Sequence, residues 1–346
     1  MVSTFPNILF LCYPGETRDW FWRGKSRDRA RELGYEVRLT DLGRPLDKSQ
    51  WASFLPDVEA VLTTWGSPRL DREVLSCNDT LKIVGHVGGS VASIVSPELY
   101  ERGVKVCTAN TLMARSVAEY SLMMTLVGLR RVLQYASFGK GGNALNWLER
   151  EPSVIPQDSV IGIWGYGDVA RWLIRFLKPL EPREIIVCDD FLDEGEAQEE
   201  GIRKVQFNEL FEQSDLVHCL TALTEENKGR VAKKQLDLLR DDAILVNCGR
   251  AALIQEQALI DALREGRFTA IMDVFETEPL AEDHPYQSMP NVILTPHNAG
   301  YGRDEYYLAA MLDEFDRFFN GRPLQTEVSL ERAIAMTNSS LMRGRS

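Results

Sequence analysis

The amino-acid sequence lacks the features that mark several large classes of protein. No apolar run approaches the roughly 20 residues that cross a bilayer. The first residues, MVSTFPNILFLCYPGE, contain no basic leader, so we expect neither a membrane span nor an export signal. The net charge of −12 argues against the basic surface that nucleic-acid binding requires. We therefore expect an ordinary globular protein of the cytoplasm that binds neither membranes nor nucleic acid.

Cysteine and histidine are also sparse. The six cysteines are far apart and form no C-x-x-C pair, which favours buried thiols over disulfides or a redox motif. No group of His, Cys, Asp and Glu has the spacing of metal ligands, so we expect no metal. Of the four histidines, His86 and His218 lie in apolar runs and His284 lies in a loop-like stretch, which leaves His297 as the candidate for chemistry.

The chain shows a regular alternation of short apolar runs and amphipathic stretches. Strands are predicted at 7–13, 35–40, 58–64, 81–87 and 104–109, and again at 159–165, 184–190, 215–221, 243–249, 269–275 and 291–296. Helices are predicted between them at 71–76, 96–103, 168–179, 207–213, 233–241 and 255–266. Strands separated by helices are typical of parallel sheets, so two such series predict an α/β protein with two doubly wound domains.

Three further segments lie outside this alternation. A long helix is predicted over 113–133, between the two series of strands. The Gly-rich and Trp-bearing stretch 136–158 has weak periodicity, and we expect an arm or long loop there, at a subunit interface. The amphipathic stretch 303–322 follows the second series and is expected to pack back on the first domain.

A dinucleotide site is predicted at the start of the second series. The segment GIWGYGDVARWL contains Gly165-x-Gly167-x-x-Ala170, directly after a strand and at the opening of a helix. Such glycines allow a tight turn and close approach of the backbone to a pyrophosphate at the helix N-terminus. Asp189 ends the next strand and can accept hydrogen bonds from a ribose 2′-OH, which favours NAD over NADP. The alternative interpretation is a tight turn that binds no ligand. The negative charge of Asp168 at the start of the helix does not favour a pyrophosphate, and this side chain could instead cap the helix.

Three residues with catalytic potential follow strands of the second series: Arg250, Glu278 and His297. Ligands of open parallel sheets bind outside the carboxyl ends of the strands, so all three are expected at the nucleotide edge. An arginine can hold the carboxylate of a 2-keto acid in a fork, and a histidine can protonate its carbonyl oxygen. A carboxylate beside the histidine favours the charged form of the ring. Taken singly, His297 could instead be a turn residue and Glu278 one of several solvated acids.

The motifs around these residues resemble those of the D-isomer-specific 2-hydroxyacid dehydrogenases. LVNCGRAALI resembles the N-x-x-R-G motif of that family, DVFETEPL its D-V-F-x-x-E-P, and TPHNAG its T-P-H-x-A-G. GYGDVA resembles its nucleotide loop, and the match runs in order over roughly residues 60–320. The resemblance implies NAD-dependent interconversion of a 2-keto acid and a D-2-hydroxy acid.

The resemblance also implies an organisation of domains. A Rossmann-type NAD-binding domain at 108–298, with a dimerisation arm at about 134–158, would be inserted in a flavodoxin-like substrate domain. That substrate domain would be built from 1–107 and 299–346, the last part ending in a C-terminal tail. A homodimer formed through the nucleotide domain is expected.

The same resemblance assigns roles to individual residues. Arg250 corresponds to the arginine that binds the substrate, and Glu278 and His297 correspond to the acid–base pair. Asp273 corresponds to the aspartate that holds the nicotinamide amide. The expected contacts to the cofactor are Gly165, Gly167, Asp168, Val169, Asp189, Thr221, Cys248, Gly249, Asp273 and Gly300.

The sequence departs from the family pattern in the loop that binds the substrate carboxylate. Family members usually have a G-x-G-x-D-like loop there, whereas this chain has Gly88-Gly89-Ser90-Val91-Ala92. Gly89 and Ser90 are still expected to contact the substrate, with Trp65 as a wall of its pocket or, equally, as core packing. Leu220-Thr221-Ala222 replaces the usual H-x-P, and Gln255 replaces a common Asp.

Two other functions fit the same motifs. A formate-dehydrogenase-like enzyme resembles this fold but pairs its histidine with glutamine, where this chain has Glu278. A dinucleotide-sensing corepressor or scaffold of the same fold would need no catalytic residues, and the presence of Arg250, Glu278 and His297 argues against it.

Overall fold

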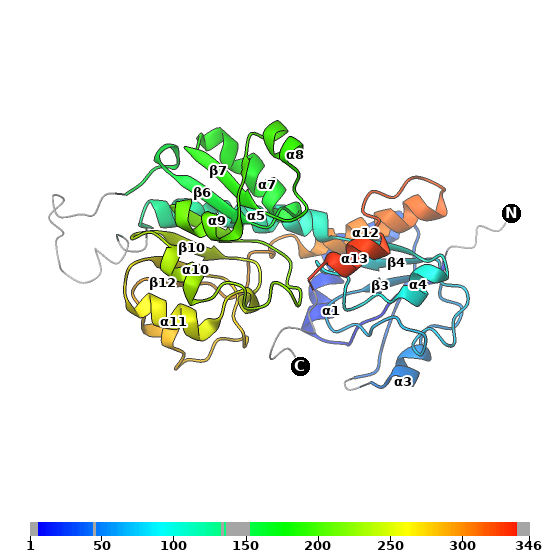
Figure 1. The fold of residues 1–346 in the computed structure, drawn as a ribbon. Coiled ribbons are helices and arrows are strands. Elements are labelled where there is room, and N and C mark those ends of the chain that lie inside the picture. The colour runs from blue at the N-terminus through cyan, green and yellow to red at the C-terminus, as the bar shows by residue number, and fades with distance from the viewer. Residues whose placement is uncertain (1–5, 44–45, 133–134, 136–152, 338–346) are drawn as a thin grey trace. The chain divides into compact units, whose positions relative to one another are not determined.

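The computed structural model describes residues 6–43, 46–132, 135 and 153–337. These residues form two compact units (Figure 1). The first unit contains the described residues up to Ala114 and those from Tyr301 onward, and the second unit runs from Arg115 to Gly300. The domain boundaries predicted from the sequence are 107/108 and 298/299.

The first unit is built on a parallel sheet of five strands in the order β2-β1-β3-β4-β5. The strands are β1 (Ile8–Phe10), β2 (Val37–Leu39), β3 (Ala60–Thr63), β4 (Ile83–His86) and β5 (Lys105–Thr108). The helices between them are α1 (Glu16–Phe21), α2 (Gly24–Glu32), α3 (Lys48–Ala52) and α4 (Pro97–Glu101). This strand order is that of flavodoxin-like sheets, as expected from the sequence.

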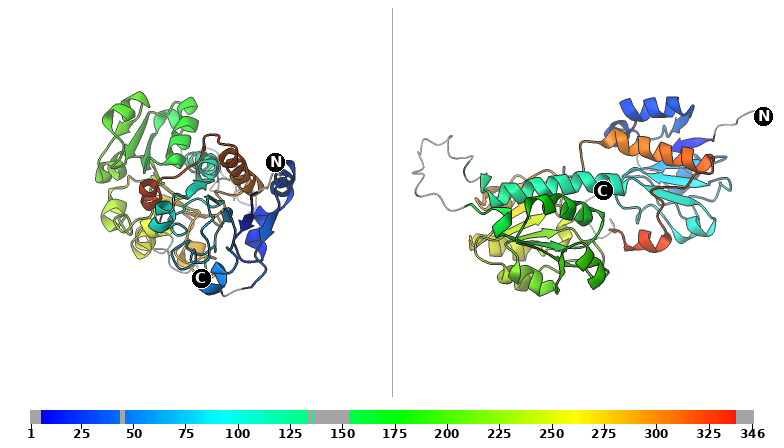
Figure 2. Two further views of the ribbon diagram at one scale, coloured as in Figure 1. Left: turned by 90° about the vertical axis from the view of Figure 1, so that its right-hand side faces the viewer. Right: turned by 90° about the horizontal axis from the view of Figure 1, so that it is seen from above.

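One face of this sheet is completed by the helix that follows the second unit. Helix α12 (Asp304–Phe319) packs against β4, α1 and α2. Figure 2 shows it in orange beside the blue N-terminal helices. Gly85 of β4 makes this contact possible, because a Cβ there would lie 3.0 Å from Met311 and Phe315 of α12. The segment predicted at 303–322 therefore does pack back on the first unit.

The end of the described chain is ordered against the same unit. Glu314 of α12 is only 3% exposed, and its Oε2 accepts hydrogen bonds from the backbone N–H groups of Gln325 (2.8 Å) and Thr326 (3.3 Å). Val328 then donates to the carbonyl of Val106 (2.8 Å), and helix α13 (Leu330–Ala335) follows. The sequence carried no periodic signal for this helix.

The second unit is built on a parallel sheet of seven strands in the order β12-β11-β10-β9-β6-β7-β8. The strands are β6 (Val160–Trp164), β7 (Glu184–Cys188), β8 (Arg203–Lys204), β9 (Leu216–Cys219), β10 (Ile244–Asn247), β11 (Thr269–Met272) and β12 (Val292–Leu294). Strands β7 and β8 are added on one side of β6, and strands β9 to β12 are added on the other side. The point beside β6 where the strand order reverses is the switch point of a Rossmann-type fold. The carboxyl end of β6 is therefore where a nucleotide is expected.

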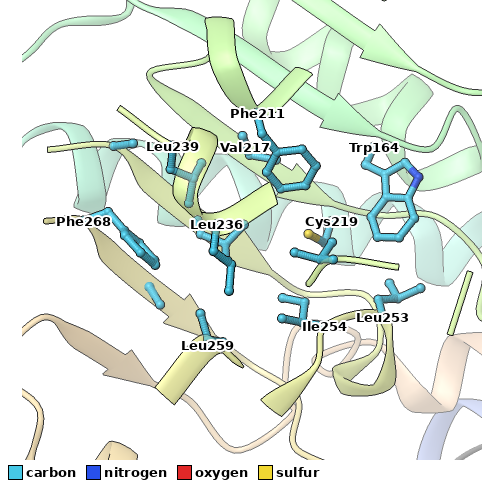
Figure 3. Close-up of a cluster of buried hydrophobic side chains, with 14 of the residues drawn as sticks. Trp164, Phe211, Val217, Cys219, Leu236, Leu239, Leu253, Ile254, Leu259 and Phe268 are labelled. Atoms are coloured by element: carbon cyan, nitrogen blue, oxygen red, sulfur yellow. The ribbon is translucent and has the colours of Figure 1, made fainter. Parts of the chain in front are cut away.

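Helices cover both faces of the seven-stranded sheet. On one face lie α5 (Asn110–Leu129), α7 (Asp168–Leu177) and α8 (Glu194–Glu199). On the other lie α9 (Phe207–Gln213), α10 (Lys233–Leu238) and α11 (Glu256–Arg264). Figure 3 shows the core between the sheet and α9, α10 and α11, in which Phe211, Leu236 and Leu259 from these three helices pack against the sheet. Leu173 and Leu177 show why α7 forms, since both are fully buried at helical spacing.

Most of the predicted elements are confirmed. Every predicted strand is present in shorter form, and the short β8 is additional. The helix predicted at 71–76 is wrong, because those residues form turns in which the side chain of Asp71 accepts from the N–H groups of Glu73 and Val74. The predicted arm lies mostly outside the described residues. None of the described helices combines the length and apolar character needed to cross a membrane.

Candidate active site

The glycine turn after β6 has the geometry of a dinucleotide loop. Gly165 has a φ of +102°, and a Cβ there would lie 2.6 Å from backbone atoms of Thr221. Gly167 forms the N-cap of α7, and nothing lies within 4 Å of where its Cβ would be. The first turn of α7 contains Asp168 and Val169. Open space at the N-terminus of a ten-residue helix fits the pyrophosphate of a dinucleotide.

Asp189 lies against this loop. Its Oδ2 accepts a hydrogen bond from the backbone N–H of Tyr166 (2.8 Å), between the two glycines. Its Oδ1 accepts from the N–H groups of Phe191 (2.8 Å) and Leu192 (3.2 Å). The structure thus brings the predicted ribose residue to the predicted pyrophosphate loop. The bonds to its own chain, which the sequence did not indicate, fix the position of its charge.

A second tight turn positions Arg250 after β10. Asn247, the last residue of β10, accepts from the N–H of Gly249 (3.1 Å) and donates through Nδ2 to the carbonyl of Arg250 (3.0 Å). Gly249 has no room for a side chain, since a Cβ would lie 2.6 Å from the carbonyl oxygen of Cys219. The guanidinium of Arg250 donates to the carbonyl of Gly249 (2.7 Å). Sequence reasoning gave Asn247 no role, although an Asn at a strand end is a turn signal, because its side chain can bond the backbone two residues on.

His297 and Glu278 form a close pair. Nδ1 of His297 lies 2.8 Å from both carboxylate oxygens of Glu278, and the side chains are 27% and 18% exposed. Glu278 also accepts from the backbone N–H of Phe275 (3.2 Å). An ionised carboxylate can only accept, so Nδ1 carries a proton and the acid–base role falls to Nε2. The geometry thus fits a histidine acid–base catalyst oriented by a carboxylate.

Asp273 fixes the loop that carries His297. Its Oδ1 accepts from Oγ1 of Thr295 (2.7 Å) and from the N–H of Asn298 (3.1 Å), and its Oδ2 accepts from the N–H of Ala299 (3.0 Å). The side chain is fully buried, and that burial raises the pKa of the carboxyl above its usual value. His297 itself adopts a φ of +51°, which a rigid support must hold. This supporting role of Asp273 was not evident from the sequence, and its contact with nicotinamide stays a prediction.

Several other predicted residues have clear places. Thr221 packs against Gly165, as described above, and Cys248 is buried, which raises the pKa of its thiol to about 12. Gly300 is the last described residue of the second unit. Their predicted contacts with a cofactor stay predictions, but the thiol of Cys248 is protonated at neutral pH.

The predicted substrate residues Gly89, Ser90 and Trp65 belong to the first unit and lie at the carboxyl ends of β3 and β4. Oγ of Ser90 donates to the carbonyl of Thr337 (2.6 Å), so Ser90 holds the C-terminal segment. Trp65 is 37% exposed, and its ring centre lies 5.4 Å from that of the buried Phe21. Trp65 is thus partly packed in the core and partly exposed. This position is compatible both with core packing and with a wall of the substrate pocket.

Two histidines are neutral and buried, which disfavours them as proton donors at neutral pH. Burial lowers the pKa of His86 to about 4 and that of His218 to about 3, so both rings are neutral. Each contacts a threonine hydroxyl, Thr63 at 3.0 Å for His86 and Thr125 at 2.8 Å for His218. In the part of the chain that the structure describes, no group of three or more His, Cys, Asp and Glu is arranged to hold a metal.

Comparison with a family model accords with this geometry. The model described as "D-isomer specific 2-hydroxyacid dehydrogenase, NAD binding domain" matches residues 122–299, which is half of the chain. The match confirms the expectation of NAD as the cofactor and assigns it to the second unit.

Similarity to individual proteins extends over most of the chain. D-3-phosphoglycerate dehydrogenase of Archaeoglobus fulgidus is 27% identical over 307 residues, which are 88% of this chain and 57% of that protein. The chain thus spans little more than half of that relative. Glyoxylate reductase of Thermococcus onnurineus is 28% identical over 309 residues, covering 86% of this chain and 90% of the relative. A solved phosphoglycerate oxidoreductase from Rhizobium etli shares the fold, with a TM-score of 0.79, 22% identity and coverage of 94% and 99%.

Proposed function

Because the chain belongs to the D-isomer-specific 2-hydroxyacid dehydrogenase family, we propose that it reduces a 2-keto acid to a D-2-hydroxy acid with NADH, and catalyses the reverse reaction with NAD⁺. The single observation that carries this proposal is the pair formed by His297 and Glu278, with 2.8 Å between Nδ1 and the carboxylate. A protein that only sensed a dinucleotide would have no need of an oriented histidine.

Arg250 is proposed to anchor the carboxylate of the substrate. Its guanidinium presents a planar fork that matches a carboxylate, and the turn set by Asn247 holds its backbone. This contact fixes the carbonyl carbon of the substrate for attack. The bound dihydronicotinamide supplies the hydride that this carbon receives.

His297 is proposed to supply the proton. As the carbonyl oxygen gains negative charge, Nε2 of the protonated ring donates its proton to that oxygen, and the ring becomes neutral. Nδ1 keeps its proton, which it shares with Glu278 throughout. Oxidation of the hydroxy acid reverses the step, with neutral Nε2 accepting the hydroxyl proton.

We propose that Asp189 favours NAD over NADP. Its carboxylate is held beside the glycine loop by three backbone N–H groups, at the strand end where a ribose 2′-OH is expected. A 2′-phosphate would meet this fixed negative charge. A homodimer and a cytoplasmic location complete the proposal.

The decisive experiment is a panel of 2-keto acids assayed with NADH and with NADPH, followed by the absorbance of the reduced cofactor. We expect turnover of at least one 2-keto acid with NADH, and a product of D configuration. Tight binding of NADH with no turnover of any keto acid would instead support a dinucleotide sensor. Oxidation of formate is not expected, since Glu278 stands where such enzymes have glutamine.

A further inference from the structure

A cationic side chain that the proposed mechanism does not use lies near the strand ends of the second unit. Arg230 belongs to the loop after β9, and its guanidinium carbon lies 4.4 Å from the centre of the Phe207 ring. Phe207, the first residue of α9, packs on Trp164 with 4.9 Å between ring centres. Trp164 ends β6 and is the labelled side chain at one end of the cluster in Figure 3. One face of the guanidinium is therefore supported by an aromatic pair.

The edge of the same guanidinium is connected to the dinucleotide loop. Nη1 of Arg230 donates to Oδ1 of Asn227 (3.3 Å). Nδ2 of Asn227 donates in turn to Oγ1 of Thr221 (3.3 Å) and to the carbonyl of Ala222 (3.1 Å). Thr221 is the residue whose backbone leaves no room for a side chain on Gly165. Arg230 is thus held in a fixed position relative to the glycine turn.

No acid among the described residues neutralises the charge of Arg230. Over the described ranges, no Asp or Glu forms an ion pair with Arg230, whereas Arg171 and Arg203 of the same unit pair with Glu196 and Glu184. Its field reaches the end of β7. Burial raises the pKa of Cys188 to about 11, and the positive charge of Arg230 opposes that rise. Cys188 directly precedes Asp189, the proposed ribose residue.

We propose that Arg230 binds the adenine of the dinucleotide, with its guanidinium plane stacked on the purine ring and Phe207 behind it. The proposal rests on the proposed function only in requiring a dinucleotide at this edge. Guanidinium planes stack well on flat π systems. Contacts on one face and one edge of the guanidinium already restrict the Arg230 side chain. Binding should therefore cost little further side-chain conformational entropy. Asp189 and Arg230 would then hold the ribose and the adenine of one adenosine.

The experiment separates the two halves of the cofactor. Dissociation constants of NADH, 5′-AMP, reduced nicotinamide mononucleotide and NADPH are measured by calorimetry for the full chain and for Arg230→Met, Arg230→Lys and Arg175→Met. Arg175 is a matched control, since its guanidinium also stacks on a ring of this unit, that of Trp172 (4.6 Å), but from the last turn of α7.

We expect Arg230→Met to weaken NADH and 5′-AMP by about tenfold or more, as loss of one base stack does. The mononucleotide should bind as before, and Arg175→Met should leave every constant within about twofold of the parent, since it removes no stack on a base. Arg230→Lys keeps the positive charge but loses the planar guanidinium, so its affinity for NADH and 5′-AMP should be as low as that of Arg230→Met. Melting temperatures are compared first, and Arg230→Lys carries the test if Arg230→Met does not fold.

Three results would overturn the proposal. Unchanged binding of 5′-AMP would remove Arg230 from the adenosine site, and equal loss of NADH and mononucleotide would assign it a structural role. A loss confined to NADPH would assign it to a 2′-phosphate. Failure of the proposed function would appear as absence of keto-acid turnover in the parent, which leaves these binding comparisons interpretable.

Discussion

Both carboxylate oxygens of Glu278 lie 2.8 Å from Nδ1 of His297, across 19 residues of sequence. The contact fixes the orientation of a ring that is only 27% exposed, so that Nε2 faces away from Glu278. A neutral amide at position 278 would retain one hydrogen bond but lose the second acceptor oxygen and the negative charge. The rate of proton transfer therefore reports on the pair directly.

For Glu278→Gln we expect kcat/KM for keto-acid reduction to fall about tenfold or more, because the amide offers Nδ1 one acceptor oxygen instead of two and supplies no negative charge beside the ring that donates the proton. NADH affinity should stay close to that of the parent. Glu276→Gln, in the same loop, is the control and should keep the parental kcat/KM. Unchanged kcat/KM in Glu278→Gln would remove Glu278 from the proposed pair.

Replacement of Arg250 tests the anchor of the substrate. We expect Arg250→Ala to lower kcat/KM for the best keto acid at least about 100-fold, equivalent to about 2.7 kcal/mol of transition-state stabilisation. NADH affinity should stay close to that of the parent. Arg264→Ala, which removes an exposed arginine of α11 paired with Asp261, is the control. Activity at the parental level in Arg250→Ala would contradict the anchoring role.

The two glycines of the dinucleotide turn should respond differently to alanine. Gly165→Ala places a Cβ 2.6 Å from the backbone of Thr221 at a left-handed φ, so we expect a loss of stability of about 2 kcal/mol or more. Gly167→Ala meets no atom of the protein at a φ of −80°, so its melting temperature should match the parent. Its Cβ would occupy the space proposed for the pyrophosphate, and NADH affinity should fall. Parental NADH affinity in Gly167→Ala would place the cofactor elsewhere.

Asp273 gives stability a pH dependence of defined sign. Burial raises the pKa of this carboxyl in the folded protein above the value of about 3.9 expected in the unfolded chain. Between the two values the folded state binds more protons, so stability falls as pH rises through this window. Asp273→Asn does not titrate. We therefore expect the unfolding free energy of the parent relative to Asp273→Asn to decrease from about pH 4 upward and then level off. Urea denaturation over that range measures it, and an increase with pH would contradict the assignment.

The sheets were predictable from the sequence because buried parallel strands are nearly continuous apolar runs. The strands 60–63 and 244–247, for example, contain only buried residues. Short helices were not predictable in the same way. Helix α1 has only six residues and buries only Phe21, so no apolar periodicity develops. The turns at 71–76 mimic a helix because Val74 and Leu75 are adjacent and buried in a polar segment.

The site was predictable in part. Arg250, Glu278 and His297 could be placed at strand ends because each follows an apolar run. The support of His297 by Asp273 could not be predicted, because its hydrogen bonds join residues 22 to 26 positions apart. The backbone contacts of Asp189 escaped prediction for a similar reason, since Tyr166 lies 23 positions away. Arg230 follows no strand directly, and only the structure shows its stack on Phe207.

The origin of α12 has a consequence for the order in which the chain folds during synthesis. Among the described residues the second unit is one continuous stretch, and its core can be completed once residue 300 has left the ribosome. The first unit is made earlier, yet the face of its sheet that contains Phe10 and Leu62 waits for Tyr307, Met311 and Phe315. We expect a fragment ending at Ala114 to expose this face and bind a hydrophobic dye, whereas the full chain does not. Of the two units, the one that is synthesised earlier is thus expected to finish folding later.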